Sequence, residues 1–86
     1  MFVYAIRYIY NRNGKVESGI FEICHTEEAD AIKAMFCDVE EIKKNLSADS
    51  IEEYKSGDGD HYDYYRIKDK TRKTTYEWFI DYLEVA

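Results

Sequence analysis

Residues 2–23, FVYAIRYIYNRNGKVESGIFEI, place the pair Asn13 and Gly14 between two runs that alternate apolar and polar residues. A two-residue type I′ turn needs positive φ at both central positions, and Asn-Gly tolerates this best. The stretch therefore predicts a β-hairpin in which Arg12 lies opposite Lys15. The same register pairs Tyr4 with Ile23, Ala5 with Glu22, Ile6 with Phe21, Arg7 with Ile20 and Tyr8 with Gly19.

This hairpin has one apolar face and one wetter face, because successive side chains of a strand point to opposite sides. Arg7 and Glu22 fall on the wetter face. A slip of one residue would exchange the two faces, so the register is well specified. The apolar face is expected to hold Phe2, Tyr4, Ile6, Phe21 and Ile23.

A helix is expected to follow the hairpin. Thr26 can act as the N-cap, and Glu27 and Glu28 complement the positive end of the helix dipole. Asp38 and Glu41 form a second capping pattern, so the helix either continues or breaks near Cys37. Apolar residues at steps of three or four predict the stripe that covers the hairpin: Ala29, Ile32, Phe36, Val39, Ile42 and Leu46.

Residues 47–61 are rich in Ser, Asp and Gly and predict mostly loop. Within them, residues 50–53 could open one helical turn, or residues 51–54 could form a short edge strand. Residues 57–60 alternate two glycines with two aspartates, which predicts a mobile tip.

The C-terminal third predicts two strands. Residues 62–68 are rich in Tyr, and residues 69–73 are typical of a polar turn. Residues 74–86 fit a helical face as well as a strand, but their β-branched and aromatic residues favour the strand. The fold expected for residues 1–86 is a single α+β domain, in which an antiparallel sheet of three to four strands carries one main helix on one face.

The composition indicates a small folded protein of the cytoplasm. Of the 86 residues 45% are hydrophobic, which is ample for one core. The N-terminus lacks the pattern of a secretory signal, and no stretch approaches membrane-spanning length. Cys24 and Cys37 are expected to be reduced thiols, each packed as a small apolar side chain.

The net charge of −6 is unevenly distributed. Residues 1–26 carry three basic and two acidic groups, residues 27–63 four and twelve, and residues 64–86 five and four, which gives +1, −8 and +1. The acidic middle disfavours binding to duplex nucleic acid and suits a partner with a basic surface.

No metal site, cofactor or catalytic group is expected. The available soft ligands, Cys24, His25, Cys37 and His61, match no zinc spacing. The acidic run at Asp58, Asp60 and Asp63 lacks the glycine and glutamate positions of an EF-hand. No nucleophile elbow or phosphate-binding loop is present, so the chain is expected not to be an enzyme.

The leading functional hypothesis is a protein-binding inhibitor or regulator that docks on a basic surface. The candidate contact residues combine carboxylates with nearby tyrosines: Glu52, Glu53, Asp58, Asp60, Tyr62, Asp63 and Tyr64.

The alternative is a single-stranded nucleic-acid binder that uses cations interleaved with Tyr residues at 62–76. Its candidate residues are Arg66, Lys68, Lys70, Arg72 and Lys73. The same cations would also be explained if they protected an edge strand from aggregation. A homodimeric module joined through a sheet edge is a third hypothesis.

In size, acidity and its hairpin, helix and strand plan, the chain resembles the small accessory proteins of phages and mobile elements, among them the anti-CRISPR inhibitors. The resemblance implies a cytoplasmic protein that blocks the nucleic-acid-binding groove of a host nuclease complex stoichiometrically.

Overall fold

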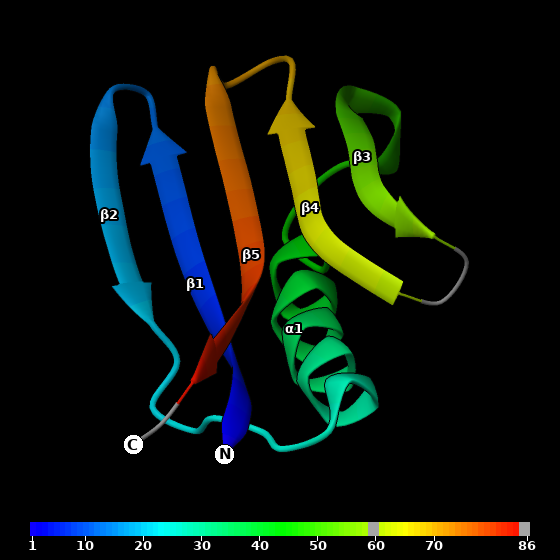
Figure 1. Ribbon diagram of the computed structural model, residues 1–86. Coiled ribbons are helices and arrows are strands. Elements are labelled where there is room, and N and C mark those ends of the chain that lie inside the picture. Colours follow the sequence, from blue (N-terminus) through cyan, green and yellow to red (C-terminus); the bar gives the residue numbers. More distant parts are fainter. Residues whose placement is uncertain (59–60, 85–86) are drawn as a thin grey trace.

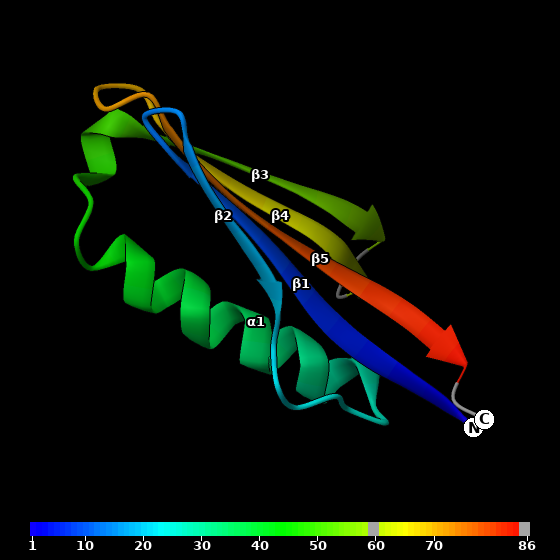
Figure 2. The same cartoon turned by 90° about the vertical axis from the view of Figure 1, so that its left-hand side faces the viewer.

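The computed structural model describes residues 1–58 and 61–84, apart from the side chains of Asp58, His61 and Tyr62. In this part of the chain, five antiparallel strands form one sheet in the order β2-β1-β5-β4-β3, and a single α-helix covers one of its faces (Figure 1, Figure 2). The α+β class is confirmed, but the predicted three to four strands are too few. The elements are β1 (Phe2–Arg12), β2 (Lys15–Ile20), α1 (Glu28–Lys43), the 3-10 helix η1 (Ala48–Ser50), β3 (Ile51–Asp58), β4 (His61–Asp69) and β5 (Thr74–Glu84).

The N-terminal hairpin turns at Asn13 and Gly14, whose φ angles of 54° and 91° are both positive. Its predicted register is confirmed from Arg12 opposite Lys15 to Arg7 opposite Ile20.

The predicted pair of Ile6 with Phe21 is also present, because the Phe21 N–H donates to the Ile6 carbonyl at 2.8 Å. The pairing predicted beyond Phe21 is wrong, because Tyr4 pairs with His25 rather than with Ile23. The chain leaves the ladder after Phe21 to reach α1, and two additional residues are looped out before pairing resumes. Ile23 therefore lies outside the core, with 69% of its surface exposed.

Helix α1 runs without a break, so Cys37 is not a boundary. Its N-cap is Glu27 rather than Thr26, and Glu27 makes no side-chain capping bond. The continuous helix is explained by Asp38, whose carboxylate bonds the sheet instead of capping a second helix.

The predicted apolar stripe is displaced around the helix. Ala31, Met35 and Val39 are buried against the sheet, whereas Ala29 is exposed. Val39 belongs to both stripes, and Phe36, Ile42 and Leu46 of the predicted stripe pack partly buried against the core. The prediction is therefore confirmed in part, and the centre of the buried stripe lies at Ala31, Met35 and Val39.

The core lies between α1 and the covered face of the sheet. Trp78 is fully buried at its centre, with its ring 5.9 Å from that of Tyr10 and 6.1 Å from that of Tyr65. The Trp78 indole N–H donates to Asp38 Oδ2 at 2.7 Å, and the Tyr10 hydroxyl donates to the same oxygen. Burial and the hydrogen bond from the Tyr10 hydroxyl to Asp38 raise the pKa of Tyr10 above its ordinary value. One carboxylate of α1 therefore satisfies polar groups of two strands.

Residues 47–61 are not mainly loop. After η1 they form β3, an edge strand that is paired along its length with the Tyr-rich strand β4. The alternative of an edge strand at residues 51–54 is thus confirmed and extends to Asp58. In the predicted mobile tip, Gly57 and Asp58 belong to β3, whereas Gly59 and Asp60 lie outside the described residues.

The two C-terminal strands are confirmed as β4 and β5. β5 lies between β1 and β4, which suits its many aromatic and β-branched residues. In the described ranges, no helix is both long and apolar enough to cross a membrane.

We predict that Asp38→Ala lowers the free energy of unfolding by about 2 to 4 kcal/mol, because two buried donors lose their acceptor. Asp38→Asn retains an amide oxygen and should cost less. Urea unfolding followed by the fluorescence of Trp78 measures both values.

Glu41 provides the matched control, since it is exposed on the same helix and pairs only with exposed Lys44 among the described residues. Glu41→Ala should change stability by less than about 0.5 kcal/mol. An equally small effect of Asp38→Ala would contradict the role assigned to its carboxylate.

Candidate functional site

The face of the sheet opposite α1 is not covered by any element in the described part of the chain (Figure 2). We call it the open face. Because Ile6, Ile67 and Trp78 point into the core, the residues that alternate with them point outward. The open face includes Val3, Ala5, Arg7, Ile9, Asn11, Val16, Ser18, Ile20, Glu52, Tyr54, Ser56, Tyr64, Arg66, Lys68, Thr75, Glu77, Phe79, Asp81 and Leu83.

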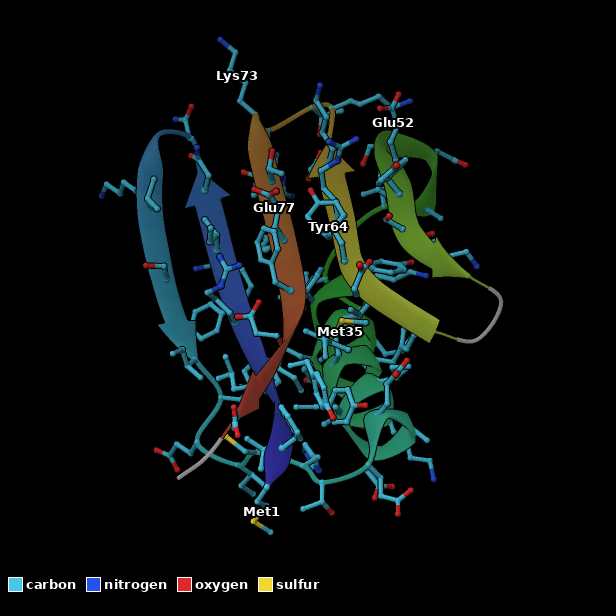
Figure 3. All side chains as sticks on the ribbon, viewed as in Figure 1. Met1, Met35, Glu52, Tyr64, Lys73 and Glu77 are labelled. Carbon is cyan, nitrogen blue, oxygen red and sulfur yellow. The ribbon has the colours of Figure 1, made fainter. Side chains whose placement is uncertain are left out.

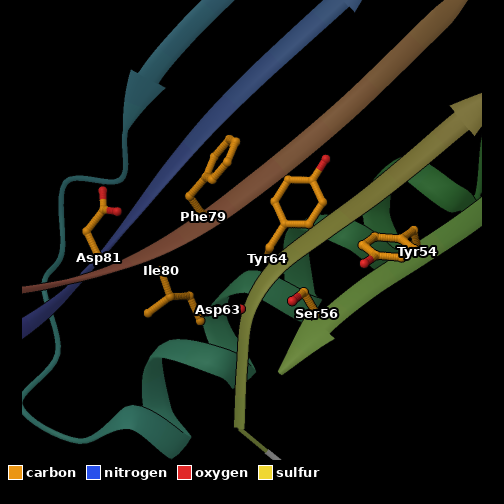
Figure 4. Close-up of a pocket in the computed structure, with 7 residues that line it drawn as sticks. All are labelled: Tyr54, Ser56, Asp63, Tyr64, Phe79, Ile80 and Asp81. Atoms are coloured by element: carbon orange, nitrogen blue, oxygen red, sulfur yellow. The ribbon is translucent and has the colours of Figure 1, made fainter. Parts of the chain in front are cut away.

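A row of aromatic rings crosses this face from β3 to β5 (Figure 4). The ring centroids of Tyr54 and Tyr64 are 6.0 Å apart, and those of Tyr64 and Phe79 are 5.0 Å apart. Two guanidinium groups lie on the row, with Arg7 4.1 Å from the Phe79 centroid and Arg66 5.2 Å from the Tyr54 centroid. We call Tyr54, Tyr64 and Phe79 the aromatic row. The row lines an open groove together with Ser56, Asp63, Ile80 and Asp81.

The aromatic row is held by cross-strand contacts. Register places Tyr64 directly opposite Phe79, and the Tyr64 hydroxyl donates to Glu77 Oε2 at 2.6 Å. Figure 3 shows Tyr64 and Glu77 side by side on β4 and β5. Arg7 is fixed over Phe79 by its ion pair with Asp81 at 3.1 Å. The rings are therefore held in place by the protein itself, which would lower the entropic cost of binding any ligand at this face.

Each cation of the open face in the described residues has a carboxylate beside it. Arg7 forms its ion pair with Asp81, and register sets Arg66 opposite Glu77 and Lys68 opposite Glu52. Opposite charges across strands attract each other and reduce the field that either sign projects into solvent. The open face is therefore close to electrically neutral.

The predicted acidic contact residues do not share one surface where the structure describes them. Glu52 lies on the open face, 3.8 Å from Lys70, whereas Glu53 lies on the covered face. Asp63 is exposed, and Tyr64 belongs to the aromatic row. The side chains of Asp58 and Tyr62, and the whole of Asp60, lie outside the described residues.

Glu53 is engaged in structural contacts. Its carboxylate accepts a hydrogen bond from Tyr65 and forms an ion pair with Lys43 of α1 at 3.0 Å. These contacts lower the pKa of Glu53 below its ordinary value of 4.5, and the hydrogen bond from Tyr65 has the largest effect. Glu53 therefore links β3 to the helix.

The predicted basic cluster is divided between two places. Arg66 and Lys68 point to the open face, whereas Lys70, Arg72 and Lys73 lie in or beside the turn between β4 and β5. The explanation by edge protection fails for Arg66 and Lys68, because β4 is paired on both sides.

The basic turn is rigidly anchored. Buried Asp69 accepts hydrogen bonds from the Thr71 backbone N–H at 3.0 Å and from its hydroxyl at 2.8 Å, and these bonds lower the pKa of Asp69. The Asn13 N–H donates to the Lys73 carbonyl at 3.3 Å, so this turn meets the N-terminal hairpin at one end of the sheet.

The thiols and the candidate metal ligands are dispersed. Cys24 and Cys37 are exposed free thiols, so the prediction that both are packed inside is wrong. They lie on the loop before α1 and on the solvent side of α1, where the core does not reach. Among residues 1–58 and 61–84, no three His, Cys, Asp or Glu residues lie close enough together to hold a metal ion.

Sequence reasoning missed Arg7, Glu77 and Phe79 as site residues. The sequence places Arg7 on the wetter face of the hairpin. It does not show what surrounds Arg7 there, because the neighbouring strand β5 is more than 60 residues away in sequence. The usable signal was the alternation in β5, where burial of Trp78 forces Glu77 and Phe79 to the other side.

Comparison of the chain with known protein families, with curated proteins and with solved structures finds no match.

We predict that Tyr64 stabilises the fold only below strongly alkaline pH. Burial and the hydrogen bond to Glu77 raise the pKa of Tyr64 to about 12, against 10.0 in an unfolded chain. The folded protein keeps this proton while the unfolded chain loses it, so the contribution is complete below pH 10 and declines as pH rises toward 12. The stability difference between wild type and Tyr64→Phe should shrink over this interval in urea unfolding. A constant difference would contradict the assignment.

Glu53 should act at the opposite end of the pH scale. Its pKa is depressed in the folded state, so its contribution is present above the ordinary value of 4.5 and is lost as pH falls below it. When the free energy of unfolding is measured from neutral to acid pH, Glu53→Gln should have a lower value than wild type at neutral pH and should lose less of it as the pH falls. Glu52→Gln is the neighbouring control, because its ion pair with Lys70 is long and exposed. Equal acid sensitivity of Glu53→Gln and wild type would exclude this role.

Proposed function

We propose that the chain is a non-enzymatic protein-binding inhibitor or regulator whose contact surface is the open face of its sheet. The observation that carries the proposal is the aromatic row. Its three rings contact one another in sequence, Arg7 lies over the Phe79 ring, and Arg66 lies over the Tyr54 ring. Tyr, Phe and Arg are the residues enriched at the centre of protein interfaces, where a few of them supply most of the binding free energy.

The charge balance favours a protein over a nucleic acid as partner. Phosphate binding requires cations that neutralise phosphates and so release the counterions of the nucleic acid, but Arg7, Arg66 and Lys68 already have carboxylates beside them. The chain as a whole carries −6, which repels a polyanion.

A single-stranded nucleic acid remains the second candidate on one observation. Arg66 and Lys68 lie with Tyr64 on β4, which needs no edge protection because it is paired on both sides. The guanidinium group of Arg66 lies over the Tyr54 ring of β3, and cations beside stacked rings are typical of single-strand binders.

The partner we propose has an apolar docking site surrounded by basic residues. The open face supplies the neutral aromatic centre, and the net charge of the molecule attracts a basic protein from a distance. A nucleic-acid-binding groove of a host nuclease complex, the target implied by the resemblance to anti-CRISPR inhibitors, would supply the basic residues of such a site. The carboxylates first proposed as contacts, among them Glu52 and Asp63, would then lie at the rim.

The test is inhibition of the RNA-guided nuclease complexes of the host by the purified protein. We expect stoichiometric loss of cleavage for wild type, and Tyr64→Ala and Phe79→Ala should each weaken inhibition about thirty-fold, the effect of losing about 2 kcal/mol at a hot spot. Lys33→Ala, on the exposed side of α1, is the control and should inhibit like wild type.

Fluorescence anisotropy with labelled single strands distinguishes the second candidate. Binding that weakens steeply with salt and is abolished by Arg66→Ala with Lys68→Ala would assign the open face to nucleic acid. Inhibition that is unchanged in Tyr64→Ala and Phe79→Ala would remove the open face from the proposed function.

A further inference from the structure

The two edges of the described sheet differ in how they are protected. β3 carries charge on both faces through Glu52 and Glu53, and its pairing shifts between Ser56 and Gly57. Charges and bulges are devices that keep edge strands from pairing with other chains. β2 forms the opposite edge, and nothing described lies beside it (Figure 1). Its open-face residues, Val16, Ser18 and Ile20, are uncharged.

The free hydrogen-bonding groups of β2 can be assigned to particular residues. The Phe21 N–H donates to the Ile6 carbonyl at 2.8 Å, so Phe21 points its backbone groups at β1. Backbone groups alternate along an antiparallel strand, and therefore Val16, Ser18 and Ile20 direct N–H and C=O away from the sheet. Val16 and Ile20 are also 65% and 64% exposed. The edge thus presents both backbone partners and apolar side chains.

The sequence of β2 is self-complementary about Ser18. In an antiparallel pair centred there, Val16 of one copy lies opposite Ile20 of the other, and the two Ser18 residues face each other. Glu17 then lies opposite Gly19, so no like charges meet. A register shifted to centre on Glu17 would instead oppose two carboxylates, which is unfavourable.

We infer that the chain forms a symmetric homodimer by antiparallel pairing of β2 with β2 of a second copy, centred on Ser18. Each pair of outward-pointing residues exchanges two backbone hydrogen bonds, and Val16 and Ile20 pack against each other twice. The two-fold axis is perpendicular to the sheet. Ten strands, five from each copy, become continuous, and both open faces lie on the same side. This inference does not depend on the proposed function, because it uses the edge and not the aromatic row.

Sedimentation equilibrium over a wide range of concentrations tests the dimer. We expect the mass to rise from 10.3 kDa toward twice that value. Ser18→Pro removes an outward N–H and blocks the approach of a second strand while preserving every bond to β1, so it should remain a folded monomer by circular dichroism. Ile20→Lys serves as a second variant and should also be monomeric. Tyr54→Lys, at the opposite edge, should dimerise like wild type.

Three outcomes would overturn the inference: a wild-type monomer at all concentrations, dimers of Ile20→Lys as strong as those of wild type, or loss of the dimer in Tyr54→Lys.

A disulfide cross-link between the two copies tests the register of the pairing. Facing residues of a hydrogen-bonded pair are about 5.5 Å apart at Cα, within reach of a disulfide. With Cys24 and Cys37 replaced by Ser, Ser18→Cys should form a covalent dimer under mild oxidation. Equal cross-linking by Glu52→Cys would refute the pairing.

Discussion

The hydrogen bond from the Trp78 indole to Asp38 sets the arrangement on which the other features depend. Trp78 is fully buried in β5, and a buried indole N–H needs an acceptor. Asp38 can supply it only if α1 turns this residue toward the sheet, and the same rotation directs Met35 and Val39 into the core. The Tyr10 hydroxyl donates a hydrogen bond to the same carboxylate, which extends the constraint to β1. One polar contact therefore fixes both which face of the helix is buried and which face of the sheet it covers.

The open face is a consequence of that choice. With Tyr76 and Trp78 inside, alternation along β5 exposes Glu77, Phe79 and Asp81 on the other side. The neighbouring strands contribute Tyr64 and Arg7, which complete the row of rings and the flanking ion pair. Local charge pairing makes this face neutral even though the molecule is acidic. An uncovered sheet face with ordered aromatic rings and no net charge is better suited to docking on a protein than to following a phosphate backbone.

The sequence predicted those features that are encoded locally. Asn13 and Gly14 defined the hairpin, and its predicted register is correct as far as Ile6 opposite Phe21, because alternation penalises a slip. The helix phase was predicted only in part: Val39 is buried as expected, but Ala31 and Met35 were missed because the predicted stripe has equally regular spacing, and only the tertiary bond of Asp38 distinguishes the two. Most of β3 was predicted as loop, with an edge strand at residues 51–54 only as an alternative, because its polar residues are stabilised by non-local pairing with β4 and by contacts such as Glu53 with Lys43. Tyr64, Arg66 and Lys68 were found as candidates, whereas Phe79 and Arg7 needed the non-local pairing of β1 with β5.

The separation between the neutral open face and the acidic remainder of the molecule has a consequence for selectivity. A surface whose cations and carboxylates cancel contributes little attraction at a distance, so the approach of a partner is governed by carboxylates elsewhere on the chain. Once such a partner was in contact, desolvation of the aromatic rings would dominate, and the partner would have to offer apolar surface where Tyr64 and Phe79 lie. A basic protein without an apolar centre would be attracted but held weakly, and an apolar surface on an acidic protein would be repelled before it docked. Under the proposed function, recognition would therefore require both properties in one partner, arranged as a basic rim around an apolar site.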